Sequence, residues 1–170
     1  MGYNVKTEKP RVIGVDKKFR TFEDLEVYQS AREFRQKMYG VTRQLPSFEK
    51  FELASQVRRA AVSLTNNVAE GHGRYHFADQ VRFFLGSRGS LQELVDELNV
   101  CADEKYLEIE KVEALKSEAW KVLGLINGYL RYLRDRKANG ESSVRETDPS
   151  AEEEDALAEL NEALGASAPF

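Results

Sequence analysis

The stretch that decides the fold is FELASQVRRAAVSLTNNVAEG, residues 51–71. Its apolar side chains recur every three or four positions, which is the spacing of one face of an α-helix. They are Phe51, Ala54, Val57, Ala61, Leu64 and Val68. Ser47 stands where an N-cap is expected, and Gly71 where a left-handed C-cap is expected. The pattern therefore predicts a helix over residues 48–70.

Similar patterns lie on either side of this stretch. The long interval between Pro46 and Pro149 contains no helix-breaking proline. Apolar periodicity predicts three more helices, over residues 22–45, 77–102 and 109–136, with Thr21 as the N-cap of the first. The connections are short, and short connections join antiparallel neighbours. The sequence therefore predicts an all-α fold, an antiparallel up-down-up-down four-helix bundle.

Charge divides the chain of 170 residues, whose formal net charge is -4, into three parts. Residues 1–20 hold six basic and two acidic groups, and residues 141–170 hold nine acidic groups and one basic group. We therefore expect a basic N-terminal arm (1–20), a bundle (21–137) and an acidic segment (138–170). For this last segment two interpretations stay open: a linker followed by a short docking helix, or a solubilising acidic tail with transient helicity. The low net charge argues against a polycationic nucleic-acid coat, although a local basic patch is compatible with it.

The motifs of several protein classes are absent from the sequence. No apolar run is long enough to span a bilayer, and the single cysteine, Cys101, excludes an intramolecular disulfide. No phosphate-binding loop, nucleophile elbow or zinc-protease motif occurs, and His72, His76 and Cys101 do not make a metal-ligand pattern. We expect a cytoplasmic protein without enzymatic activity, cofactor, metal or membrane contact.

The polar side of the second predicted helix carries Gln56, Arg59, Ser63, Asn67 and Glu70 at helical spacing. Amide and hydroxyl side chains suit fixed hydrogen bonds better than the flexible lysines of an ordinary solvated face. Two interpretations stay open. The strip is an interface with another protomer or with RNA phosphates, or it is an ordinary outer face.

A second strip lies on the third predicted helix and contains Arg82, Gly86, Gly89, Ser90, Glu93 and Glu97. Gly124 and Gly128 lie within the fourth. A glycine inside a helix costs roughly 0.8–1 kcal/mol relative to alanine, so we expect these glycines at close helix–helix contacts, within a bundle or between protomers. Arg88 falls within the apolar stripe of its helix, which predicts an ion pair with an acid such as Glu93 or one on a neighbouring helix, unless the side chain extends to the edge with only its stem buried.

Several motifs together resemble a known family. They are FEDLEVYQ at residues 22–29, Leu45-Pro46, QVRRAAVS at 56–63, NVAEG at 67–71, RFFL at 82–85 and GSLQEL at 89–94. In this order they resemble the four helix bundle protein family, which includes proteins encoded in intervening sequences of large-subunit ribosomal RNA genes. The family also looks related to the accessory variability determinant of diversity-generating retroelements. The resemblance covers about residues 21–137.

This resemblance implies a homopentamer of four-helix bundles and no catalytic activity. The candidate oligomer or partner interface comprises Gln56, Ser63, Asn67, Glu70, Gly89, Ser90 and Glu93. The retroelement proteins bind a reverse transcriptase and nucleic acid through a strongly basic surface. The alternative function is therefore an accessory factor that binds RNA or DNA beside a reverse transcriptase. Its candidate phosphate contacts are Arg58, Arg59, Arg74, Arg82 and Arg88.

Overall fold

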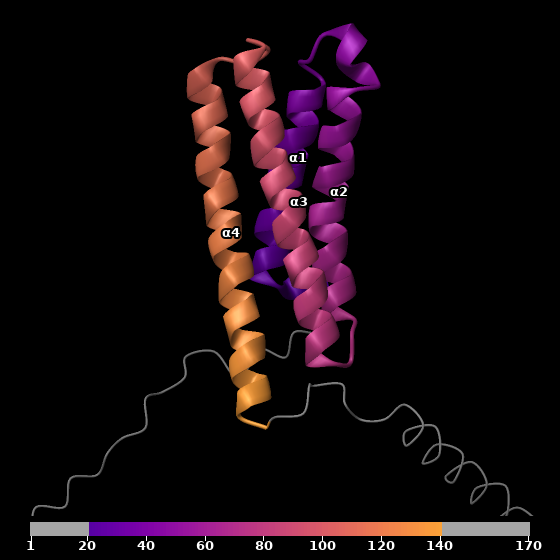
Figure 1. Ribbon diagram of the computed structural model, residues 1–170, viewed down its shortest axis with the longest axis vertical. Helices are drawn as coiled ribbons and strands as arrows, with labels where there is room; N and C mark the ends of the chain where they lie inside the picture. Colours follow the sequence, from indigo (N-terminus) through magenta and orange to yellow (C-terminus); the bar gives the residue numbers. More distant parts are fainter. Residues whose placement is uncertain (1–20, 141–170) are drawn as a thin grey trace, which may run out of the picture.

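The computed structural model describes residues 21–140, which form four long helices and no strand (Figure 1). The helices are α1 (Glu26–Thr42), α2 (Leu53–His72), α3 (Phe77–Asp103) and α4 (Ile109–Ala138), accompanied by the short 3-10 turns η1 (Phe22–Asp24) and η2 (Ser47–Lys50). The prediction of an all-α fold with four helices is confirmed. The predicted basic arm and nearly all of the acidic segment lie outside the described residues. Within residues 21–140, no helix combines the length and apolarity needed to cross a membrane.

Each helix contacts two others, so that α1, α2, α3 and α4 enclose one core. Between α2 and α3, Asn67 lies against Gly86 and Ser63 contacts Ser90, which makes this pair antiparallel. Between α1 and α4, Lys37 pairs with Glu118 at 2.6 Å. The core is filled by large side chains that are almost completely buried, among them Phe34, Met38, Leu64, Phe84, Leu91, Leu94, Leu98, Ile126 and Leu133.

The start of the first helix differs from the prediction. Thr21 does cap a helical segment, since its hydroxyl accepts from the Glu23 amide and the Asp24 carboxylate accepts from the Thr21 amide. This capping box, however, begins the 3-10 turn η1. Leu25 then adopts an extended conformation and turns its side chain into the core before α1 begins. The helix ends at Thr42 rather than Leu45.

The second helix was predicted wrongly at both ends. Ser47 belongs to η2, and α2 begins only at Leu53, so Phe51 is 77% exposed instead of lying in the core. Gly71 is not a left-handed cap but a buried residue within α2, and Gly73 caps the helix at φ -77°. Glycine suits this position because the Phe83 and Phe84 side chains lie 3.0 Å from where a Cβ would be.

The third and fourth helices begin where predicted, at Phe77 and Ile109. The turn between them holds Lys105 in the left-handed conformation, with φ 58°. The Tyr106 amide donates to the Cys101 carbonyl at 2.9 Å, and the Lys105 amide to the Ala102 carbonyl at 3.0 Å. These are the two hydrogen bonds of a Schellman motif, which normally has glycine at the left-handed position.

Candidate functional site

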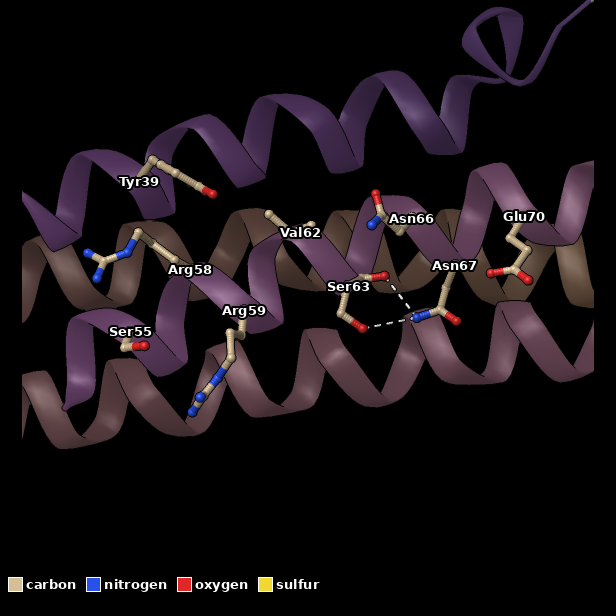
Figure 2. A pocket seen from close by; sticks show the side chains of 9 residues that line it. All are labelled: Tyr39, Ser55, Arg58, Arg59, Val62, Ser63, Asn66, Asn67 and Glu70. Atoms are coloured by element: carbon tan, nitrogen blue, oxygen red, sulfur yellow. Dashed lines mark hydrogen bonds between the residues drawn. The ribbon is translucent and has the colours of Figure 1, made fainter. Parts of the chain in front are cut away.

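The polar strips predicted on the second and third helices meet in the structure. Ser63, Asn67, Gly86 and Ser90 form what we call the α2–α3 seam. Asn67 Nδ2 donates to the Ser63 carbonyl at 2.8 Å and to Ser63 Oγ at 3.1 Å (Figure 2), and Ser90 Oγ donates to Ser63 Oγ at 2.8 Å. A Cβ on Gly86 would lie 2.8 Å from Asn67 Oδ1. The Ser63–Ser90 hydrogen bond therefore joins α2 to α3, while Asn67, which is hydrogen-bonded within α2, packs against Gly86.

A shallow groove of about 540 Å³ runs along α2 on the side facing α1. We call it the α1–α2 groove; its lining is Tyr39, Ser55, Arg58, Arg59, Val62, Ser63, Asn66, Asn67 and Glu70 (Figure 2). Arg58 donates to the Lys50 carbonyl at 2.9 Å, and Glu70 is paired with Arg74. Because Glu70 is the one carboxylate of this lining, the groove offers mainly amide, hydroxyl and guanidinium donors.

A second groove, of about 390 Å³, lies on the other side of α2. This α2–α3 groove is lined by Gln56, Arg59, Ala60, Ser63, Glu93, Asp96 and Glu97. Burial, together with the negative charges of Glu93 and Asp96, raises the pKa of the Glu97 carboxyl to about 7, and the positive charge of Arg59 opposes this rise. Glu97 is 8% exposed, and its Oε2 accepts no hydrogen bond. The two grooves thus differ in the sign of their charge.

Glu97 belongs to the polar strip of the third predicted helix, yet it was not among the candidate site residues. One sequence signal could have indicated it, because Glu97 lies directly before Leu98 and three residues after Leu94, both of which are core residues. A carboxylate at that spacing lies at the edge of the buried face. The sequence does not show that Arg59 of α2 is a neighbour.

The five candidate arginines do not gather in one place. Arg59 lines both grooves and extends from α2 toward α3, whereas Arg58 lines only the α1–α2 groove and points to the other side (Figure 2). Arg74 lies beyond the end of α2, over the Phe83 ring at 4.7 Å. Arg82 and Arg88 are exposed on α3 and line neither groove.

The predicted burial of Arg88 is wrong. Its neighbour Ser87 occupies the inward position and donates its hydroxyl to the Leu64 carbonyl at 2.8 Å. One residue later a helix has turned by about 100°, which points Arg88 outward. Arg88 makes no ion pair with Glu93 in the described part of the chain.

The glycines fall into two groups. Gly86 lies against the Asn67 side chain of α2, as predicted for a close helix contact, and Gly71, which was predicted as a cap, lies against side chains of α3. Gly89, Gly124 and Gly128 have no heavy atom within 4 Å of the place where a Cβ would be, so the prediction of a close contact inside the bundle is wrong for these three. A contact of these glycines with another protomer remains a prediction.

The candidate interface residues therefore have different surroundings. Ser63, Asn67 and Ser90 are used within the seam, and Glu70 pairs with Arg74. Gln56 and Glu93 line the α2–α3 groove, and Gly89 is open. Across residues 21–140, no three His, Cys, Asp or Glu side chains are grouped so that they could hold a metal ion.

The model of the 23S rRNA-intervening sequence protein family matches residues 23–128, from η1 to the Gly128 turn of α4. The match covers more than half of the chain. The chain belongs to this family. The match includes both grooves and the seam, so the candidate site lies within the part that the family defines. A comparison with curated proteins found no match.

Proposed function

We propose that the chain is a non-enzymatic cytoplasmic scaffold that assembles as a homopentamer of up-down-up-down bundles. Membership of the 23S rRNA-intervening sequence protein family supports an accessory role of this kind. The main support for self-assembly is a stripe on the outer side of α4. This α4 stripe consists of Trp120, Gly124, Gly128 and Tyr132, spaced by four residues.

The α4 stripe has the form of a helix-packing surface. Trp120 is 47% exposed and Tyr132 is 48% exposed, and no other helix of the described part of the chain comes within 4 Å of where a Cβ of the two glycines between them would be. Rows of residues spaced by four are the ridges and grooves by which helices interlock. The two glycines leave a notch in this row that can admit the ridge of another helix. Without such a neighbour they would cost about 0.8–1 kcal/mol each with no compensating contact.

Sedimentation equilibrium of the full chain and of a Gly124→Gln/Gly128→Gln variant tests this proposal. We expect a pentamer for the unchanged chain and a smaller species for the variant, because two long side chains fill the notch. Gly40→Gln is the matched control, since Gly40 is also an open helical glycine but lies on α1. A monomer at micromolar concentration for the unchanged chain, or a pentamer for the double variant, would contradict assembly through the α4 stripe.

A second candidate function is binding of RNA or DNA phosphates in the α1–α2 groove, and one observation favours it. Arg58 and Arg59 line the groove together with Ser55 and Asn66, which are donors suited to phosphate oxygens. Its one carboxylate, Glu70, is neutralised by its pair with Arg74. A partnership with a reverse transcriptase remains a prediction from the family resemblance.

Phosphate binding predicts a steep dependence on salt, because each neutralised phosphate releases a counterion. We expect the affinity for an RNA hairpin, measured by fluorescence anisotropy between about 50 and 200 mM salt, to fall with a slope that Arg58→Gln reduces by about one. Arg88→Gln, which lies outside both grooves, is the control. Equal slopes for the unchanged chain and Arg58→Gln would remove the α1–α2 groove from consideration.

A further inference from the structure

The least satisfied polar group of the described residues lies in the α2–α3 groove. Glu97 Oε2 is inaccessible to solvent and accepts no hydrogen bond from the protein. A buried carboxylate that lacks donors is costly, because it has exchanged its hydration for nothing. The nearest opposite charge, Arg59, lowers the pKa of Glu97 but lies beyond the 4.0 Å limit of an ion pair. The carboxylate therefore has unused capacity to accept hydrogen bonds.

The surroundings of Glu97 add negative charge to the groove. Glu93, one turn earlier on α3, and the adjacent Asp96 add two more carboxylates to the lining of the groove. Facing them from α2 are the neutral side chains of Gln56 and Ser63 and the single cation Arg59. Three carboxylates against one guanidinium leave an excess of negative charge in a groove of about 390 Å³.

We propose that the α2–α3 groove binds a guanidinium or primary ammonium group of a ligand. The exposed carboxylates of Glu93 and Asp96 are its first acceptors, and Glu97 becomes its innermost acceptor when the side chain turns Oε2 toward the groove. Such a group donates several hydrogen bonds and brings the charge that the groove lacks. It could be an arginine or lysine side chain of a polypeptide or the end of a free polyamine. The groove contains no residue of the α4 stripe, so the test of cation binding is independent of the test of the proposed assembly.

The donor set favours an organic cation over a metal ion. No three carboxylate, histidine or cysteine side chains in residues 21–140 are arranged to surround a metal ion. Arg59 also lines the groove and would repel a compact divalent charge at close range. A flat guanidinium, in contrast, can take Glu97 at one edge, leaving its other N–H groups for acceptors at the mouth of the groove.

Binding of a cation here should depend on pH in a defined direction. The group that titrates is Glu97, which interacts with Glu93 and Asp96 on α3 and with Arg59 on α2. The Cys101 thiol lies near enough to interact with both Glu97 and Glu49. The Glu97 pKa is raised to about 7, so the carboxyl is mostly protonated at about pH 6 and mostly ionised at about pH 8. A cation binds the ionised form better, and affinity should therefore rise across this interval.

Two probes distinguish the two sources of the cation. N-acetyl-arginine amide stands for a polypeptide side chain, and spermidine stands for a free polyamine. Each is titrated into the full-length protein at about pH 6 and pH 8, and binding is followed by isothermal titration calorimetry and by amide chemical shifts. We expect saturable binding of at least one probe, about tenfold tighter at the higher pH, with shifts at Glu97 and Ser63.

Glu97→Gln tests the residue itself, since it keeps the shape of the side chain and removes its charge. We expect it to weaken binding at about pH 8 by about tenfold and to abolish the pH dependence. Glu93→Gln, at an exposed position, gives a second variant that should weaken binding without threatening the fold. Glu33→Gln, an exposed carboxylate on α1, is the matched control and should bind as the unchanged chain does.

The two probes and the variants give distinguishable outcomes. Tighter binding of the arginine derivative supports a polypeptide side chain, and tighter binding of spermidine supports a free polyamine. The proposal is overturned if neither probe binds, if Glu97→Gln and Glu33→Gln bind equally well, or if calcium alone saturates the groove and displaces both probes.

Discussion

The α2–α3 seam and the α4 stripe both contain glycine within a helix, but the glycines have opposite surroundings. Both place glycine within a long helix, at Gly86 in the seam and at Gly124 and Gly128 in the stripe. In the seam, the space beside the glycine is filled by Asn67, which in turn bonds to Ser63. In the stripe, no atom of the described part of the chain lies within 4 Å of the Cβ positions.

The difference shows that a glycine within a helix does not by itself identify a contact. Its cost in helix propensity is the same in both places, about 0.8–1 kcal/mol. The neighbouring residues determine how that cost is offset. In the seam it is offset by contacts inside the bundle, and in the stripe, as we propose, by contacts with a second chain. Substitutions that fill these spaces test the comparison directly.

The largest effect is expected at Gly71, the glycine nearest to large side chains. Gly71→Leu would force its side chain against Phe83 and Phe84, which lie 3.0 Å from the Cβ position. We expect the free energy of unfolding to fall by about 3 kcal/mol or more, because overpacking displaces core side chains. Urea denaturation measures this loss. Gly40→Leu, in open space on α1, should not be destabilising, and equal losses at both sites would show that burial of Gly71 is not the cause.

A second test uses the charge of the α2–α3 groove, which the α4 stripe lacks. The Glu97 pKa rises from 4.5 to about 7 on folding, so the folded state holds this proton more tightly than the unfolded state. The stability that this provides is complete below pH 4.5 and disappears as pH rises through about 7, a loss of at most about 3 kcal/mol. Relative to the unchanged chain, Glu97→Gln should therefore become more stable between about pH 5 and pH 8. Urea denaturation at several pH values measures the free energy of unfolding of both proteins. A difference between them that stays constant with pH would contradict the prediction.

The smallest effect, and the sharpest comparison, is expected at Gly86. In Gly86→Ala the new methyl group displaces the Asn67 amide, which loses its bonds to Ser63, while the helix gains propensity. These changes nearly cancel, and we expect less than about 0.5 kcal/mol. In an Asn67→Ala background the clash is absent, so Gly86→Ala should stabilise by about 0.8–1 kcal/mol. A double-mutant cycle in urea measures this coupling, and strict additivity would show that Asn67 and Gly86 do not interact.

The sequence predicts the fold well where apolar periodicity is long and uninterrupted. The starts of α3 and α4, at Phe77 and Ile109, follow directly from it. The prediction fails around Phe51, whose spacing fits the core stripe although it precedes the helix. There the 3-10 turn η2 uses Ser47 and Pro46 in a local geometry that periodicity does not distinguish from the first turn of an α-helix.

The candidate site is predictable only in part, because its properties arise between helices. The strips containing Ser63 and Ser90 are visible along the chain, but their mutual hydrogen bond depends on the register of α2 against α3. The desolvation of Glu97 likewise depends on what packs beside it. Arg88 is the opposite case to Glu97, because the sequence predicted burial and the structure shows exposure. The small neighbouring residue Ser87 takes the inward position instead.

The rate at which Cys101 reacts with a thiol reagent reports on the opening of the end of α3. Its thiol is fully buried, and burial raises its pKa to about 11, so the nucleophilic thiolate is scarce in the native protein at neutral pH. The backbone carbonyl of the same residue accepts the Tyr106 amide in the turn held by Lys105. A thiol reagent can therefore react only when this turn and the end of α3 open. Its labelling rate reports how often that happens, without any engineered probe.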